Sequence, residues 1–181
     1  MTWLGEEPRP FAAPSPPLGW TIAVGVQSFE AKYVLEPGVT ERFVKELRAA
    51  RLFESVLYPI PPGLDPTWEM RLLVRETFAD PSSNFWKAVL NGIFFPARFV
   101  VYSDEEYTLD VEVILTRRDA VVGTYAAHGP VRYRYQAYSD ELKREAEGVD
   151  LILTRTTQEI FRQIAADAER LNAEDRARAG R

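Results

Sequence analysis

The sequence predicts an α+β domain: a mixed, largely antiparallel sheet of four to six strands with two main helices packed on one face. Three patterns indicate this fold class. Residues 107–115 alternate apolar and polar side chains, as in a strand with one covered face. Residues 153–171 carry an apolar stripe at helical spacing, which needs a sheet face to cover it. A shorter stripe of the same kind runs through residues 40–53.

Composition sets limits on the class of protein. With 181 residues, the chain is long enough for one domain with a sizeable core. A net charge of −5 argues against nucleic acid as a partner. The sequence has no cysteine, which excludes disulfides, thiolate metal sites and thiol catalysis. Its one histidine, His128, provides no imidazole cluster for zinc or iron, so we expect no metal and no cofactor.

The chain divides into three segments. Residues 1–19 are a proline-rich amino-terminal arm, residues 20–172 form a single α/β domain, and residues 173–181 are a charged tail. The first residues lack the basic start and apolar stretch of a signal peptide. We therefore expect either a cytoplasmic protein or an exported one from which the export segment has been removed. No apolar run reaches the ~18 residues of a membrane-spanning helix.

The first half of the domain is predicted to contain three strands and a helix. The first strand spans residues 19–33, and the small residues Ala23 and Gly25 on its second face predict that a helix lies close there. A helix follows from Thr40, its expected N-cap, to Phe53. A short strand at 55–58, a proline-rich loop and a strand at 68–78 come next.

The second half is predicted to contain a hairpin and the last helical region. The strand from Tyr107 turns at residues 117–119 and returns through residues 121–127. Gly129 and Pro130 predict a bulge or bend before the strand resumes. Ser139 or Asp140 can cap the final helical region, in which Gly148 is a candidate break.

Several passages resemble a broad group of bacterial envelope lipoproteins. The passages that show this resemblance are Arg48-Ala-Ala-Arg-Leu-Phe-Glu-Ser-Val56, Asn91-Gly-Ile-Phe-Phe-Pro96, Tyr107-Thr-Leu-Asp-Val-Glu-Val113 and the helix from Thr156 to Leu171. The group shares a fold type with the amino-terminal domain of the TolB translocation protein and with lipoprotein activators of peptidoglycan synthases. The resemblance covers residues 20–172 and transfers no catalytic residue. The chain departs from the group because it shows neither an export signal nor a lipid-bearing cysteine.

The run from Phe85 to Val101 is the main candidate site because it gathers large apolar side chains in a short span. It is either a helix that closes the core or a partly exposed patch for a partner or a membrane surface, with Lys87, Asn91 and Arg98 at the rim. The candidate partner-binding residues are Phe85, Trp86, Val89, Leu90, Ile93, Phe94, Phe95 and Phe99.

Three other features are better explained as ordinary surface. His128 has no nucleophile or orienting acid at a recognisable spacing, so we expect a turn or surface histidine. The acids of residues 104–106, with Asp110 and Glu112, lack the spacing of a calcium loop. We expect Arg132 to lie near Asp104 as a cross-strand charge pair. In residues 132–135 arginines and tyrosines alternate onto opposite faces, which disfavours a nucleic-acid platform.

The favoured interpretation is a non-catalytic, envelope-associated, lipoprotein-like interaction or assembly protein. It would bind a partner protein of the cell envelope through the apolar run or a sheet edge, with peripheral membrane contact as a further option and no nucleic acid. Its location would be periplasmic or outer-membrane-associated, and its oligomeric state is open. The alternative is a soluble small-ligand-binding domain or enzyme in the cytoplasm, which predicts a deep pocket with converging polar groups.

Overall fold

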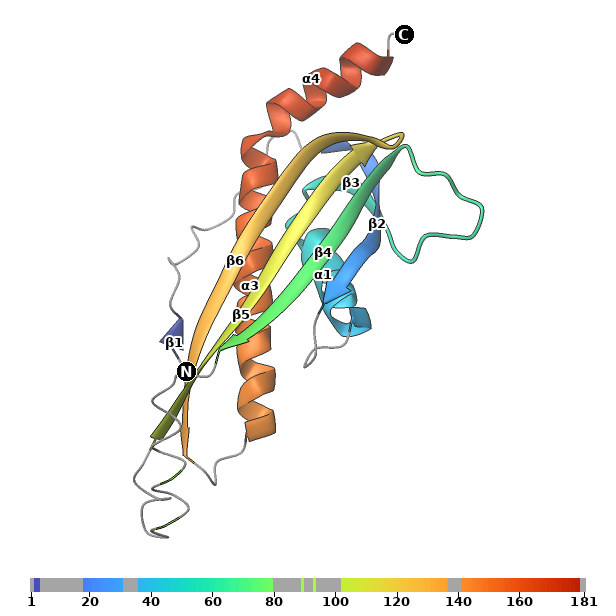
Figure 1. The fold of residues 1–181 in the computed structure, drawn as a ribbon. Coiled ribbons are helices and arrows are strands. Elements are labelled where there is room, and N and C mark those ends of the chain that lie inside the picture. Colours follow the sequence, from blue (N-terminus) through green and yellow to red (C-terminus); the bar gives the residue numbers. More distant parts are fainter. Residues whose placement is uncertain are drawn as a thin grey trace.

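The computed structural model describes residues 2–3, 18–30, 36–79, 89, 93, 102–136 and 141–179, with side chains for 18–30, 38–77, 89, 93, 106–132 and 151–177. The strands of this part are β1 (Thr2–Trp3), β2 (Leu18–Glu30), β3 (Phe53–Leu57), β4 (Trp68–Ala79), β5 (Tyr102–Arg117) and β6 (Ala120–Gln136). They form one sheet in the order β1-β6-β5-β4-β2-β3 (Figure 1). The pairs β1–β6, β6–β5 and β5–β4 are antiparallel, whereas β2 is parallel to β4 and β3.

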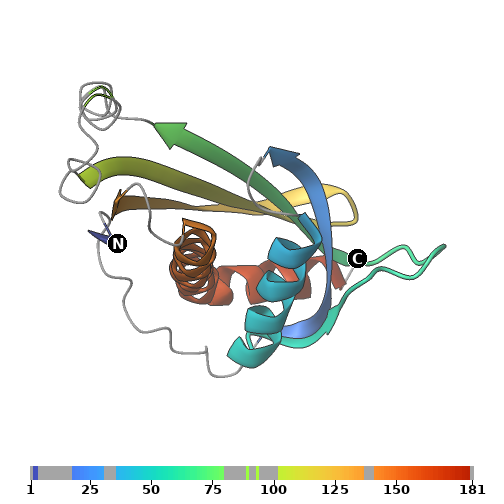
Figure 2. The same cartoon turned by 90° about the horizontal axis from the view of Figure 1, so that it is seen from below.

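Two helices, α1 (Glu36–Ala50) and α3 (Glu141–Ala166), pack on one face of this sheet (Figure 2), and α4 (Ala168–Ala179) continues beyond its end (Figure 1). Phe43 of α1 meets Phe161 of α3 edge-on, with ring centroids 5.5 Å apart. This arrangement confirms the predicted α+β class. The largest fully buried side chains are Phe43, Leu18, Ile22, Leu47, Leu52, Met70, Leu72, Leu109, Leu115, Ile152, Ile160 and Ile164.

The helix boundaries differ from those predicted. Helix α1 begins at Glu36 rather than at Thr40, and Thr40 is buried inside it. Pro37 is compatible with the first turn, where its missing N–H would have no intrahelical acceptor. The helix ends at Ala50 because Arg51 adopts a left-handed conformation with φ of 52°.

The final helical region is broken at Asp167 rather than at Gly148, through which α3 runs unbroken. Asp167 is a turn residue, and its backbone carbonyl accepts a hydrogen bond from the amide of Leu171 in α4. The apolar stripe of residues 153–171 therefore lies on two successive helices. A glycine inside a helix costs only about 1 kcal/mol relative to alanine, which the packing of α3 on the sheet can offset.

Gly129 and Pro130 do not interrupt β6, because both pair in register with β5. The irregularity lies near the turn instead, where the register shifts between Leu115 and Thr116. Gly129 serves another purpose: a Cβ there would lie 2.6 Å from Cγ2 of Ile152 and 2.8 Å from Cγ2 of Thr156. The glycine thus allows α3 to approach the sheet closely.

The second face of β2 is covered differently from the prediction. No described helix lies on Ala23 and Gly25, since α1 and α3 occupy the opposite face of the sheet (Figure 2). A Cβ on Gly25 would meet Oε1 of Glu69 at 3.2 Å and Cδ1 of Ile60 at 3.9 Å. Gly25 therefore faces β4 and the loop of residues 58–67, which extends away from the sheet (Figure 1).

Candidate interaction surfaces

The predicted apolar patch is represented in the described residues by Val89 and Ile93. Both are helical, and they lie one turn apart. Val89 is half-buried, but the side chain of Ile93 is 80% exposed. An exposed isoleucine is unexpected if the run only closes the core. The remaining six residues of the predicted patch lie outside the described part of the chain: Phe85, Trp86, Leu90, Phe94, Phe95 and Phe99.

The edge strand β3 is partly occupied by a side chain of its own fold. One guanidinium nitrogen of Arg48, Nη2, donates hydrogen bonds to the backbone carbonyls of Val56 (3.2 Å) and Tyr58 (3.3 Å). An unpaired strand edge is a template for another chain, and an arginine on its carbonyls blocks that template. Strand addition at β3 therefore requires displacement of Arg48.

The opposite edge, formed by β6 and the two residues of β1, is blocked in a similar way. Arg170 donates to the carbonyl of Val122 at 3.0 Å, and Nε2 of Gln163 donates to that of Ala126 at 3.0 Å. Because the backbone alternates, Pro130 directs its nitrogen, which carries no hydrogen, to the same edge as Ala126. Strand β1 then pairs beside Arg132. Neither edge of the described sheet offers a long free ladder.

The face of the sheet opposite the helices carries a row of charged side chains. Register places Glu30, Arg75, Asp110 and His128 side by side across β2, β4, β5 and β6. Arg75 Nε lies 3.2 Å from Glu30 Oε2, and His128 Nδ1 lies 2.5 Å from Asp110 Oδ1. His128 is thus an exposed strand residue with a carboxylate partner rather than a turn residue.

Beside this row lies a shallow groove of about 300 Å³. A second row crosses its floor, in which Ser28, Leu73, Glu112 and Ala126 are neighbours by register. Within the described part of the chain, Glu112 has no hydrogen-bond or ion-pair partner. No group of three or more acids or histidines among the described residues could hold a metal ion.

The predicted pairing of Arg132 with Asp104 is wrong by two residues. Arg132 pairs in register with Glu106 and forms an ion pair with it, Nη2 to Oε1 at 2.5 Å. The turn is centred on Arg118 and Asp119, and the irregularity near the turn adds one more residue to β6. Both effects move the partner of Arg132 along β5. The side chains of residues 104–105 and 133–135 lie outside the described part.

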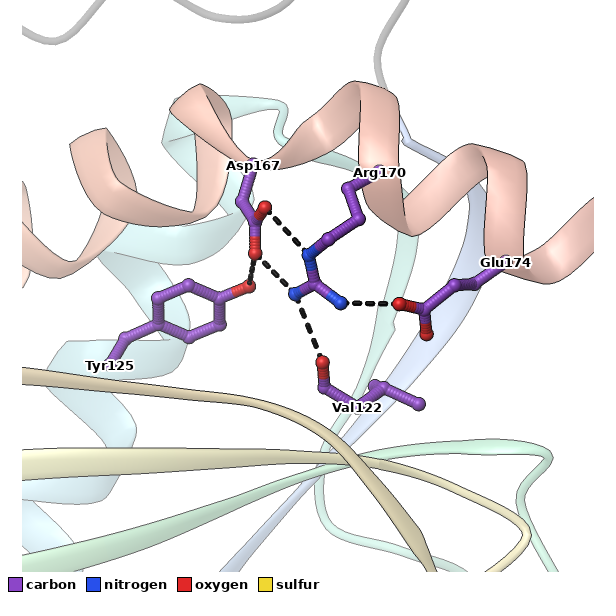
Figure 3. A network of polar contacts seen from close by, with 5 residues as sticks. All are labelled: Val122, Tyr125, Asp167, Arg170 and Glu174. Atoms are coloured by element: carbon purple, nitrogen blue, oxygen red, sulfur yellow. Dashed lines mark hydrogen bonds and ion pairs between the residues drawn. The ribbon is translucent and has the colours of Figure 1, made fainter.

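A polar network holds the junction of α3 and α4 against β6 (Figure 3). The hydroxyl of Tyr125 donates to Oδ2 of Asp167 at 2.8 Å, and Nε of Arg170 donates to Oδ1 at 2.8 Å. Arg170 also contacts Glu174 and the carbonyl of Val122. One guanidinium thus connects the junction, the next turn of α4 and the edge of the sheet.

This network shifts the titration of its members. The hydrogen bond from Arg170 lowers the pKa of Asp167 below its ordinary value, against the opposing effect of burial. Burial, followed by the hydrogen bond to Asp167, raises the pKa of the Tyr125 phenol well above its ordinary value. Asp167 therefore stays ionised and Tyr125 stays protonated at neutral pH, as their hydrogen bond requires.

An aromatic cluster fixes α4 to the end of the sheet. Trp20 and Trp68 stack with ring centroids 3.8 Å apart, and the guanidinium carbon of Arg117 lies 5.6 Å from the Trp68 centroid. Arg117 is buried and pairs with Asp175 of α4 at 3.0 Å. The indole N–H of Trp20 donates to Asn172 at 3.3 Å.

Neither the network nor the groove is evident from the sequence. The spacing of Asp167, Arg170 and Glu174 is a recognisable signal, because residues three or four apart on a helix are neighbours. The partner Tyr125 lies 42 residues away and becomes visible only with the register. The groove depends on the pairing of four strands, for which one sequence carries no direct signal.

The described residues contain no helix long and apolar enough to cross a membrane. No protein-family model and no curated protein matches the sequence.

Solved structures with the same fold include three bacterial proteins. Lipoprotein B of Nitrosomonas europaea has a TM-score of 0.55 at 9% identity, covering 89% of this chain and 92% of that one. A Xanthomonas campestris protein of the DUF330 family has a TM-score of 0.54 at 12% identity, covering 92% of this chain and 97% of that one. A minor lipoprotein of Acinetobacter baumannii has a TM-score of 0.50 at 12% identity, covering 83% of this chain and 95% of that one. The chain therefore has a fold found in bacterial lipoproteins.

Proposed function

We propose that this protein is a non-catalytic, envelope-associated interaction protein that binds a partner protein through the apolar run of residues 85–99. The observation that carries the proposal is Ile93, whose large apolar side chain is 80% exposed. An exposed isoleucine within a run of large apolar residues is what a partner-binding patch at this run predicts. The fold shared with bacterial lipoproteins supports an envelope location. A closer relation to TolB or to the synthase activators stays a prediction.

Side chains that occupy backbone carbonyls at both sheet edges favour partner binding at the apolar run over addition of a partner strand. Arg48 occupies one carbonyl of β3 and one just beyond it, and Arg170 and Gln163 occupy carbonyls on β6. A partner strand would first have to displace these side chains. An apolar patch needs no such rearrangement, so we place the interface at residues 85–99 and retain a membrane surface as a second ligand for the same patch.

The alternative is a small-ligand-binding domain or enzyme in the cytoplasm. It calls for an enclosed pocket with converging polar groups. The groove on the open face of the sheet is shallow, and four of its charged side chains form pairs with each other. A thermal-shift screen with a metabolite library tests this alternative, because a ligand that raises Tm by several degrees would favour it over a protein interface.

The decisive experiment is capture of partners from a bacterial envelope extract on immobilised protein. We expect Ile93→Glu to lose a captured protein that the wild type retains. Val121→Glu is the matched control, because Val121 is also a large exposed hydrophobic residue, at 61%, but lies beside the β5–β6 turn. Both variants should melt like the wild type. Equal capture by Ile93→Glu and the wild type would overturn the proposal.

A double variant tests the core interpretation of the same run. If residues 94 and 95 belong to an interface, Phe94→Ser with Phe95→Ser should keep the melting transition and lose the partner. If they belong to the core, the two truncations should cost several kcal/mol and unfold the protein. A melting curve separates the outcomes, and fractionation of cells that produce the natural full-length protein tests the envelope location.

A further inference from the structure

Two neighbouring rows of side chains line the groove on the open face of the sheet. Glu30, Arg75, Asp110 and His128 form the charged row as two paired sets. Leu73 and Ala126 flank Glu112 across the adjacent strands. The carboxylate of Glu112 is thus the charge of the described groove that is left without a counterion.

The electrostatic balance of the groove is negative. Its lining includes three carboxylates, Glu30, Asp110 and Glu112, against the guanidinium of Arg75 and the imidazole of His128. The sum is negative with the imidazole in either protonation state. Since Arg75 and His128 already contact Glu30 and Asp110, they do not neutralise Glu112 directly. A cation that enters the groove therefore gains an ion pair without displacing one.

We propose that this groove binds a lysine or arginine side chain from an extended segment of a partner protein. Such side chains place an aliphatic stem along apolar surface and a charged head at a polar group. Here the stem would lie on Leu73 or on Ala126, which flank Glu112 on either side, and the head would meet Glu112. A volume of about 300 Å³ is at the lower end of ligand sites, which suits one long side chain rather than a folded ligand.

The occupant is identified by charge complementarity. An anionic segment would meet three carboxylates, and an apolar one would leave Glu112 buried without a partner. The site is separate from the run at residues 85–99, so it stands or falls independently of the interface proposed above. Loss of capture in Ile93→Glu would not affect it, and loss of binding in a Glu112 variant would not affect the other.

The test is an NMR titration of the whole chain with a blocked peptide of sequence Ser-Lys-Ser-Lys-Ser at low salt. We expect shifts confined to amides of residues 28–30, 73–75, 110–112 and 126–128. Glu112→Gln should weaken binding about fivefold, the factor that corresponds to ~1 kcal/mol for a partly exposed ion pair. Glu41→Gln on the exposed side of α1 is the matched control and should bind like the wild type.

Two further ligands complete the experiment. A peptide with glutamate in place of lysine should not bind, and equal binding would overturn the proposal. Spermidine tests whether a free polyamine, rather than a side chain of a partner protein, supplies the cation that binds Glu112. If spermidine bound as tightly as the peptide with the same dependence on Glu112, the groove would take small cations and the partner segment would be refuted. An unchanged affinity in Glu112→Gln would also overturn it, and the amide spectrum shows whether that variant is folded.

Discussion

Gly129 of β6 and Ile152 of α3 lie so close together that a Cβ on the glycine would be 2.6 Å from Cγ2 of the isoleucine. We expect Gly129→Ala to destabilise the protein by about 1–3 kcal/mol, because the added methyl group forces α3 away from β6. Urea denaturation measures the change.

The control for this substitution is Gly38→Ala in the first turn of α1. A Cβ there meets nothing within 4 Å, so the variant should be neutral or slightly stabilised. An equal loss of stability in both variants would mean that close packing of α3 is not the cause.

The ion pair between Arg117 and Asp175 is expected to fix α4 to the sheet. Asp175→Asn should lower the free energy of unfolding by roughly 1–3 kcal/mol, because it leaves the buried Arg117 guanidinium without its charged partner. Asp119→Asn removes an exposed partner of Arg71 and should cost no more than about 0.5 kcal/mol. Similar losses in the two variants would argue against a special role for Arg117.

The lowered pKa of Asp167 predicts a specific pH dependence. A carboxyl group with a lower pKa in the folded than in the unfolded state stabilises the protein above the unfolded pKa of about 3.9. This contribution is lost as the pH falls through the folded pKa. The stability gap between the wild type and Asp167→Asn should therefore be full at pH 7 and shrink below about pH 4. Asparagine keeps the size and shape of the side chain, so the comparison reports on its charge.

Denaturation curves at a series of pH values measure this gap. Asp65→Asn in the exposed loop of residues 58–67 is the control and should give a curve parallel to that of the wild type. A gap that stays constant down to pH 2 would contradict the assignment of the acid-sensitive contact to Asp167.

Arg48 is expected to prevent association through β3. Arg48→Ala frees the carbonyls of Val56 and Tyr58, so this variant should form dimers or larger species as its concentration rises. Analytical ultracentrifugation detects the change, and Lys45→Ala, an exposed position on the same helix, should sediment like the wild type. The two variants should differ little in stability, because the Arg48 contacts are exposed.

The elements that sequence reasoning predicted well are those with one buried face. The alternation of residues 107–115 matches β5, whose apolar positions are buried and whose polar positions are only partly covered. A strand with one buried face alternates apolar and polar residues, so the sequence directly indicates which side chains are buried. For the apolar run a helix was one of two alternatives, and Val89 and Ile93 are helical.

The errors arise where a local signal has two physical explanations. Pro37 is a residue type that interrupts the middle of a helix, but it fits the first turn of α1. Gly129 reads as a bulge but serves close packing against Ile152, a contact between residues far apart in the chain. The groove around Glu112 depends on the register of four strands, and a single irregularity near the β5–β6 turn changes which charges meet.

The pairing of Thr2 with Arg132 has a practical consequence for handling the molecule. It holds the start of the chain beside the end of β6 that is remote from the turn, whereas α4 projects past the other end (Figure 1). A linker attached ahead of Thr2 and a dye attached near Ala179 would leave from opposite ends. Protein tethered to a sensor chip by its front end would hold α4 and the β5–β6 turn outward, within reach of analytes in the flow.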